Sequence, residues 1–195
     1  MIFKVAELAG QQANLAGATF GGELLGRVVE QLDAAGTPPV PLVVFDFTGI
    51  ESASASFLKA LVFGLLPAPT GDSSDQRNRV EAFPVVLGMQ QLVREELVDY
   101  LGLAGRAAVE ALSLQGEELL SARLLGHLDE ALHLTLVALL RKGAATATEL
   151  HAESGGKINI TAWNNRLADL YVKRLARRRR QGKQWIYEPI ARELE

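Results

Sequence analysis

The chain has 195 residues, of which 48% are hydrophobic and 22% are charged, and its net charge is −3. This length suits one large domain or two small ones, and the balance is ordinary for a water-soluble globular protein. The sequence contains no cysteine, which excludes disulfide bonds, thiol nucleophiles and cysteine-bound metal sites. No stretch has the apolar length of a membrane span or the pattern of a secretory signal, so we expect a cytoplasmic protein.

The charges are distributed unevenly along the chain. Residues 141–195 carry 12 Lys and Arg and 6 Asp and Glu, a net charge of +6, whereas the remaining residues carry 8 and 17, a net charge of −9. Such asymmetry suggests that the C-terminal part meets a polyanion while the acidic part meets other partners. A basic run can also be simply a solvated surface. The sequence pattern around the run has to decide between these two interpretations.

The first part of the chain alternates strand patterns with amphipathic helix patterns. Strands are expected over 2–8, 42–47, 85–87 and 108–114, and helices over 23–32, from Ser54 or Ser56 to Leu65, and over 90–101. Residues 42–47 are almost continuously apolar, which is typical of a central strand covered on both faces. The polar segment 67–79 predicts a surface loop. We therefore predict an α/β domain with a mixed sheet over residues 1–116.

Residues 43–61, VVFDFTGIESASASFLKAL, resemble the conserved turn of STAS domains, the fold of anti-sigma factor antagonists. The resemblance is closest to a STAS-like group with a DF-x-G strand and extends over about residues 17–114. It implies an α/β domain that docks a protein partner. In the antagonists this turn carries Asp-Ser-Ser-Gly, and a partner kinase phosphorylates the second Ser. The alignment places Ser54 at the Asp and Ser56 at that Ser, so it implies phosphorylation or docking at these two residues.

The residue chemistry leaves two roles open for Ser56. Its hydroxyl can cap the helix that follows, a contribution of about 1 kcal/mol. Alternatively, phosphorylation would place nearly two negative charges beside Asp46 or Glu51 and change the surface that a partner meets.

A second domain is expected to follow a linker at residues 117–126. The segment 127–142 is strongly helical, with one apolar stripe and Gly143 as its stop. The stripe consists of Leu128, Leu132, Leu136 and Leu139. Thr146 and Glu149 then have the spacing of a capping box, which predicts a short helix that ends near Ser154.

The segment that follows predicts another helix and a hairpin. This helix starts at Asn159 or Thr161, and Gly182 separates the expected strands 177–181 and 183–189. The residues expected on the buried face of the helix are Ile160, Trp163, Leu167, Leu170 and Tyr171. Trp185 and Tyr187 are expected to pack the hairpin against the helices. Together these elements predict a small α+β winged helix-turn-helix domain over residues 127–195.

Such a domain places its second motif helix in the major groove of duplex DNA and its wing on the backbone or the minor groove. The candidate DNA-binding residues are Thr161, Asn164, Asn165, Lys173, Arg177, Arg178, Arg179, Arg180 and Lys183. Asparagine suits adenine edges, Ala168 or Val172 suits a thymine methyl, and the cations suit phosphates. Asp169 on the same face opposes DNA because phosphate repels a carboxylate, so a protein-binding face stays an alternative.

Enzymatic patterns do not occur in the sequence. It contains no Gly-rich phosphate loop, no GxSxG elbow and no HExxH helix, so we predict no catalytic residue and no cofactor. His127, His133 and His151 lack a second ligand type at metal spacing, and we predict no metal site.

We therefore expect a non-enzymatic regulator in which a STAS-like domain receives a protein partner and a winged helix binds duplex DNA. Winged helices often act as dimers, so a homodimer is a further expected partner, through the helix at 127–142 or the acidic domain. The alternatives are a protein-interaction adaptor or partner-switching regulator that does not bind DNA, and an RNA-binding protein.

Overall fold

The computed structural model describes residues 1–36, 40–65 and 82–195, and the loop predicted at 67–79 lies outside these residues. The strands are β1 (Ile2–Lys4), β2 (Asn14–Leu15), β3 (Leu42–Asp46), β4 (Ser52–Ala53), β5 (Phe83–Leu87), β6 (Ala107–Gln115), β7 (Glu118–Gly126), β8 (Ala176–Gln181), β9 (Gln184–Pro189) and β10 (Ala191–Leu194). The helices are α1 (Val5–Leu8), α2 (Ala18–Ala34), α3 (Ala55–Val62), the 3₁₀ turn η1 (Phe63–Leu65), α4 (Gln91–Ala104), α5 (Glu130–Lys142), α6 (Ala147–Glu153) and α7 (Ile160–Val172).

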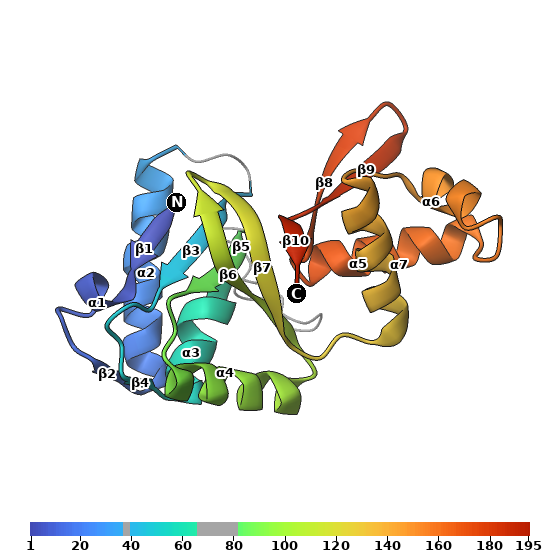
Figure 1. Ribbon diagram of the computed structural model, residues 1–195. Coiled ribbons are helices and arrows are strands. Elements are labelled where there is room, and N and C mark those ends of the chain that lie inside the picture. The colour runs from blue at the N-terminus through green and yellow to red at the C-terminus, as the bar shows by residue number, and fades with distance from the viewer. Residues whose placement is uncertain (37–39, 66–81) are drawn as a thin grey trace.

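Six strands form one sheet in the order β1-β3-β5-β6-β7-β10 (Figure 1). The first four are parallel neighbours, β7 is antiparallel to β6, and β10 is parallel to β7. The prediction of an α/β protein with a mixed sheet is therefore confirmed, and parallel pairs dominate the sheet. Short pairs also form between β2 and β4 and between β8 and β9.

Strand β3 is buried on both faces, as its continuous apolar run predicts. Val43 and Phe45 point into one hydrophobic cluster, and Val44 points into a second cluster on the other face. This alternation follows from the period of two residues in a strand. The sheet therefore needs a cover on each side.

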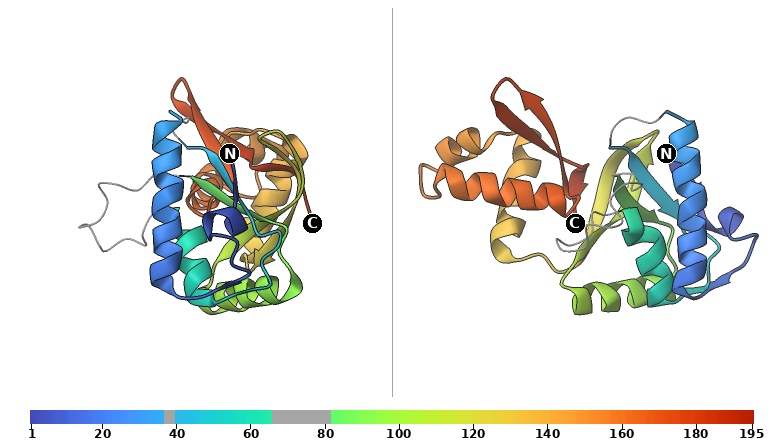
Figure 2. Two further views of the ribbon diagram at one scale, coloured as in Figure 1. Left: turned by 90° about the vertical axis from the view of Figure 1, so that its left-hand side faces the viewer. Right: turned by 180° about the vertical axis from the view of Figure 1, so that it is seen from behind.

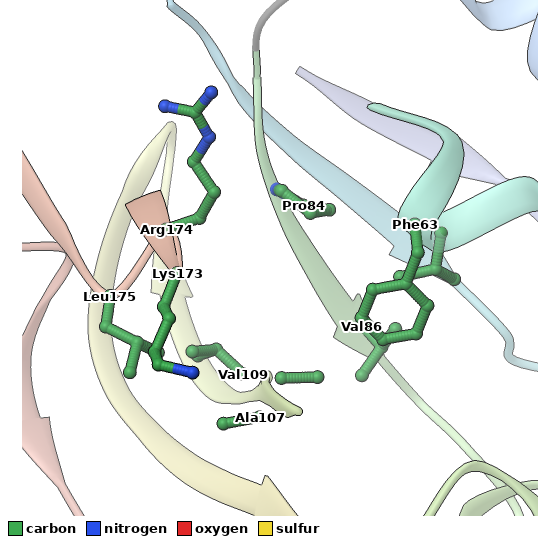
Figure 3. Close-up of a pocket in the computed structure, with 10 residues that line it drawn as sticks. Phe63, Pro84, Val86, Ala107, Val109, Lys173, Arg174 and Leu175 are labelled. Atoms are coloured by element: carbon green, nitrogen blue, oxygen red, sulfur yellow. The ribbon is translucent and has the colours of Figure 1, made fainter. Parts of the chain in front are cut away.

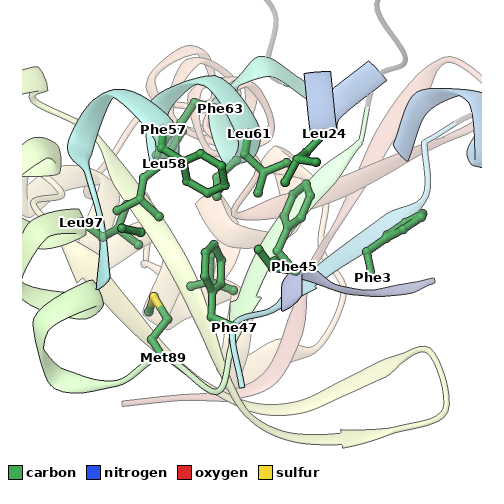
Figure 4. Close-up of a cluster of buried hydrophobic side chains, with 14 of the residues drawn as sticks. Phe3, Leu24, Phe45, Phe47, Phe57, Leu58, Leu61, Phe63, Met89 and Leu97 are labelled. Atoms are coloured by element: carbon green, nitrogen blue, oxygen red, sulfur yellow. The ribbon is translucent and has the colours of Figure 1, made fainter. Parts of the chain in front are cut away.

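Helices α2, α3 and α4 cover the first face. Their apolar side chains surround Phe45 and Phe47, and the close-up in Figure 4 shows these rings directed toward Leu58 and Leu61 of α3. Helices α2 and α3 approach closely at Gly21, where an added Cβ would lie 2.6 Å from the carbonyl oxygen of Phe57. A larger residue at this position would push the two helices apart.

The second face is covered by residues 130–189, which comprise α5, α6, α7, β8 and β9 and are called the helix–hairpin unit below. Its buried side chains form one cluster with Val44, Val85 and Val109 of the sheet. The cluster includes the whole predicted leucine stripe: Leu128, Leu132, Leu136 and Leu139. Seen from behind in Figure 2, the unit lies on the opposite side of the sheet from α2 and α3, and α4 runs along the lower end of the sheet. The two halves of the chain therefore share a hydrophobic core.

The predicted linker at 117–126 is wrong, because this segment forms strand β7 and pairs with β6. Residues 108–114, expected to be the last strand of the α/β domain, belong to β6, and the same sheet continues with β7 and β10. Strand β7 buries Leu119, Ala122 and Leu125 at a spacing of three. Its pairing with β6 contains register shifts, so the simple alternation that marks a strand in sequence is absent.

The end of the chain returns to the sheet through β10. Ala191 pairs with Leu119 of β7, and Arg192 forms an ion pair with Glu118 at 2.7 Å. Because β7 leads into the helix–hairpin unit and β10 follows it, two neighbouring strands hold the unit at both ends.

A buried carboxylate joins α4 to the sheet. Glu110 of β6 is 2% exposed and accepts hydrogen bonds from Arg94 at 2.7 Å and 3.0 Å. These bonds raise the pKa of Arg94 above its ordinary value. Arg123 of β7 lies 3.7 Å from the same carboxylate, so Glu110 is paired from both sides.

Other boundaries differ from the sequence expectation by several residues. The strand expected over 2–8 stops after Lys4 and continues as α1, and the helix expected over 23–32 extends from Ala18 to Ala34. In the described part of the chain, no helix is both long enough and apolar enough to cross a membrane.

Replacing Val85 by Ala tests the shared core. Val85 is fully buried in β5, in the cluster that contains the helix–hairpin unit, so its loss should lower the free energy of unfolding by about 2 kcal/mol. Both tryptophans, Trp163 and Trp185, lie in the unit, and their fluorescence should shift in urea together with far-UV circular dichroism. Leu103→Ala, at a position 92% exposed, is the matched control. A tryptophan transition unaffected by Val85→Ala would contradict a common core.

Candidate nucleic-acid interface

Helix α6 begins with the predicted capping box. The Thr146 hydroxyl accepts the Glu149 amide at 3.2 Å, and the Glu149 carboxylate accepts the Thr146 amide at 2.7 Å. Both hydrogen bonds satisfy backbone donors that a helix start leaves without an intrahelical partner. The Thr146 amide, and to a smaller extent the Thr146 hydroxyl, which donates to the same carboxylate at 2.9 Å, lower the pKa of Glu149 below its ordinary value. The capping box and the short helix are therefore confirmed.

A compact turn joins α6 to α7. Gly155 and Gly156 both have positive φ, as expected for residues that reverse the chain after a helix. The His151 side chain donates from Nδ1 to the carbonyl oxygen of Ile158 at 2.7 Å, because a carbonyl can only accept. Asn159 caps α7 through a 2.7 Å bond from the Ala162 amide. Local hydrogen bonds thus hold the turn between the two helices.

Helix α7 buries one face and exposes the other. Trp163, Leu167 and Leu170 are buried as predicted, but the prediction for Ile160 is wrong, because it is 39% exposed. Ile160 is the first residue of α7, where the helix extends beyond the core that covers its later turns. The candidate residues Thr161, Asn164 and Asn165 are exposed.

Strands β8 and β9 form the predicted hairpin around Gly182, whose φ is +61°. Arg178 lies opposite Tyr187, and Arg180 lies opposite Trp185. Because side chains alternate along a strand, these four residues share one face, called the inner face below. Arg177 and Arg179 belong to the other, outer face.

The inner face carries a stack of aromatic rings and guanidinium groups. The Arg178 guanidinium lies 4.0 Å from the ring centre of Tyr171 on α7 and 4.5 Å from that of Trp185. Arg180 lies 6.0 Å from the Trp185 ring. Trp185 was expected in the hairpin core but is 41% exposed, whereas Tyr187 is buried as expected. The sequence contains a signal for this pairing: with Gly182 in the turn, the hairpin register places Arg180 opposite Trp185.

The outer face has different contacts. Arg179 donates to Glu188 at 2.9 Å, and Arg177 lies 5.7 Å from the ring centre of Phe83 on β5. The outer face is therefore engaged with its own strand partner and with the sheet. Of the four consecutive arginines, Arg178 and Arg180 share the inner face, on which Arg178 contacts Tyr171 of α7.

Two other candidate cations lie apart. Lys183 is exposed in the hairpin turn. Lys173, at the end of α7, lines a narrow pocket with Ala107, Val109 and Phe63, and Figure 3 shows its side chain beside Ala107. Lys173 therefore faces the sheet rather than the exposed side of α7, and the structure does not bring it together with the other candidates.

Asp169 is exposed on α7, one turn after Asn165. Its carboxylate is the one acidic side chain within α7, so the exposed face combines hydroxyl, amide, methyl and carboxylate groups. Arg166 stacks over the Trp163 ring at 5.9 Å and lies on the flank of the helix. The basic charge of the unit is thus concentrated on the hairpin, while α7 is nearly neutral.

No family model, curated protein or solved structure matches this chain. Within residues 1–36, 40–65 and 82–195, no group of three or more His, Asp or Glu side chains is arranged to hold a metal ion.

The second candidate surface is the start of α3. Ser54 caps this helix, because its hydroxyl accepts the Phe57 amide at 3.3 Å and also the Gly17 amide at 3.2 Å. The Glu96 carboxylate of α4 accepts the Ala55 amide at 2.9 Å. Ser56 is exposed with its hydroxyl 3.1 Å from that of Ser54, so the suggested cap at Ser56 is wrong and the cap is Ser54.

The two serines should differ in their effect on stability. Ser54→Ala removes two hydrogen bonds to backbone amides and should lower the free energy of unfolding by about 1 kcal/mol. Ser56→Ala removes an exposed hydroxyl outside the cap and should change it by less than about 0.5 kcal/mol. Urea unfolding of both variants provides the comparison, and an equal or larger loss for Ser56→Ala would contradict this assignment.

Glu149 should make the capping box sensitive to acid. Since its pKa is lower in the folded chain than in the unfolded chain, its charge stabilises the fold above the ordinary pKa of Glu. That stabilisation is lost as the pH falls through the lowered pKa. We expect the stability difference between wild type and Glu149→Gln to be constant near neutral pH and to shrink below pH ~4.5. Thermal unfolding measured over a pH series tests this, and a difference that grows with acid would refute it.

Proposed function

We propose that this protein is a DNA-binding regulator in which the helix–hairpin unit acts as a winged helix. Helix α7 would enter the major groove, and the β8–β9 hairpin would be the wing that holds the flanking backbone. The observation that carries the proposal is the junction at Tyr171, where Arg178 of the inner face stacks on α7. This contact supports the proposal, because it joins one of the two inner-face arginines directly to α7.

The dimensions of α7 support this proposal. Its 13 residues span about 20 Å, and a major groove about 12 Å wide admits one α-helix. Thr161, Asn164 and Asn165 lie in its exposed N-terminal half, which is the part of a recognition helix that contacts base edges. Near the C-terminal end, Tyr171 packs against the sheet and meets Phe83 edge to face at 6.3 Å between ring centres, whereas Val172 is 57% exposed.

The stacked arginines remain suited to phosphate. A cation–π contact uses the face of the guanidinium, while its N–H donors lie in the plane and point outward. Arg178 therefore keeps donors for phosphate oxygens while Tyr171 and Trp185 hold its orientation. This arrangement reduces the side-chain entropy lost on binding.

The N-terminal part, residues 1–116, is proposed to be a STAS-like module that receives a protein partner. The helix–hairpin unit already covers the second face of its sheet, and the proposed partner surface is the side of α3 and α4 on the first face. Ser56 and Glu96 lie there at the start of α3. A docked partner or a phosphate group at Ser56 would lie next to the Glu96 carboxylate, which already accepts the Ala55 amide at this helix start.

A protein-interaction adaptor is the second candidate function. The exposed Asp169 and the 57% exposed Val172 on α7 favour it, because a carboxylate opposes phosphate and an apolar side chain suits a protein surface. The two functions can be distinguished by the salt dependence of binding to duplex DNA.

Two double variants with the same loss of charge test the DNA-binding function. Labelled duplex DNA of random sequence is titrated with the full chain by fluorescence anisotropy over a salt series. Wild type should bind more weakly as salt rises, and Arg178→Ala with Arg180→Ala should flatten the slope of log K against log salt by about 2 units. Arg177→Ala with Arg179→Ala is the matched control on the outer face and should change the slope less.

The outcomes separate the candidates. Equal slopes for the two double variants would refute the inner face as the phosphate surface. If no duplex binds even at low salt, the DNA-binding function falls and the adaptor function takes its place.

A further inference from the structure

The outward stripe of α7 contains methyl groups and an amide. Thr161, Asn165, Ala168 and Val172 follow one another at spacings of four, three and four residues, which places them on one side of the helix. Thr161 and Asn165 are exposed, and Val172 is 57% exposed. The side chains of Ala168 and Val172 are purely apolar, and the stripe has no Lys or Arg.

The cations that α7 does possess point elsewhere. Arg166 stacks on Trp163 at 5.9 Å, on the flank of the helix. Lys173, at the C-cap, lines the pocket against Ala107 and Val109 of the sheet. The four residues of the outward stripe are uncharged, and the fold directs Arg166 and Lys173 away from it. The stripe is therefore neutral.

We infer that α7 recognises A·T base pairs in the major groove, an inference that rests on the proposed DNA-binding function. An asparagine amide can both accept from N6 and donate to N7 of adenine, so Asn165 matches the adenine edge. The methyl groups of Thr161, Ala168 and Val172 match the C5-methyl of thymine, which is the one apolar group on the major-groove edges.

Guanine and cytosine fit this stripe poorly. Guanine presents two acceptors that are most often bound by Arg or Lys, and the stripe contains neither. Burying Val172 against the amino group of cytosine would remove water from a donor without replacing its hydrogen bond. Asp169, beside the stripe, accepts from the amino group of adenine as well as from that of cytosine, so it does not reverse the preference.

The same chemistry favours DNA over RNA. Uracil lacks the methyl group that the stripe would contact, and the major groove of A-form RNA is too deep and narrow for side chains to read. The inferred ligand is therefore duplex DNA with an A·T-rich core, and the wing adds sequence-independent phosphate contacts.

Selection from a duplex pool with a randomised centre tests this directly, with the full chain as bait. We expect enrichment of A·T pairs. Each selected thymine is then replaced by deoxyuridine, which keeps every hydrogen-bonding group and removes only the methyl. Binding should weaken about two- to fourfold for each contacted methyl.

Variants assign the contact to α7. Asn165→Ala should reduce the ratio of affinities for A·T-rich and G·C-rich duplexes about tenfold, and Val172→Ala should abolish the deoxyuridine effect at one thymine. Leu103→Ala, an exposed position on α4, is the control and should change neither. Alanine has a higher helix propensity than Asn or Val, so loss of the helix does not explain these changes.

Enrichment of G·C pairs, or equal binding of thymine and deoxyuridine duplexes, would overturn the inference. If salt-dependent binding to random DNA persists in that case, the proposed function still stands. If no duplex is bound at any salt concentration, the proposed function and this inference fail together.

Discussion

Two neighbouring strands, β3 and β5, are apolar on both faces, and the structure depends on covering both. The segments nearest in sequence, α2 and α3, cover one face, and the helix–hairpin unit covers the other. Neighbouring strands β7 and β10 hold this unit at both ends. A unit fixed in this way cannot swing freely on a linker. Its exposed surfaces, above all the N-terminal half of α7 and the β8–β9 hairpin, are thereby held in one orientation relative to the α3 and α4 side of the sheet.

The junction between sheet and unit has a strained residue at its centre. Arg174 follows the end of α7 with a φ of +61°, a conformation in which glycine is the usual choice. Its side chain is 3% exposed and lies over the rings of Phe83 at 5.5 Å and Tyr171 at 5.0 Å. Glycine would relieve the backbone but would remove this packing, so the contact is what offsets the strain. Tyr171 also supports Arg178 of the β8–β9 hairpin, so its ring lies between arginines of two different segments.

Local patterns could be predicted from the sequence, whereas long-range pairing could not. The Thr146 capping box, the leucine stripe of α5 and the turn at Gly182 each depend on residues a few positions apart, and all three are present. Strand β10 pairs with a segment more than 70 residues earlier, and nothing in its own four residues specifies that partner. The same limit explains why β7 resembled a linker. Among the candidate site residues, exposure of Thr161, Asn164 and Asn165 followed from helical spacing, but the orientation of Lys173 depended on where the sheet lies.

The run of four arginines shows how a strand changes the meaning of a charge cluster. In the sequence the four look equivalent, and their summed charge suggests one continuous phosphate surface. In the hairpin, alternation divides them into two pairs: the inner pair stacks on aromatic rings beside α7, and the outer pair meets Glu188 and the ring of Phe83. Arg177 of the outer pair thus contacts the sheet, whereas Arg179 pairs with Glu188 inside the hairpin. The inner pair is the one that we propose to bind phosphate, and the proposed base contacts lie on the neutral stripe of α7. Affinity and specificity would then reside on separate elements, joined at Tyr171.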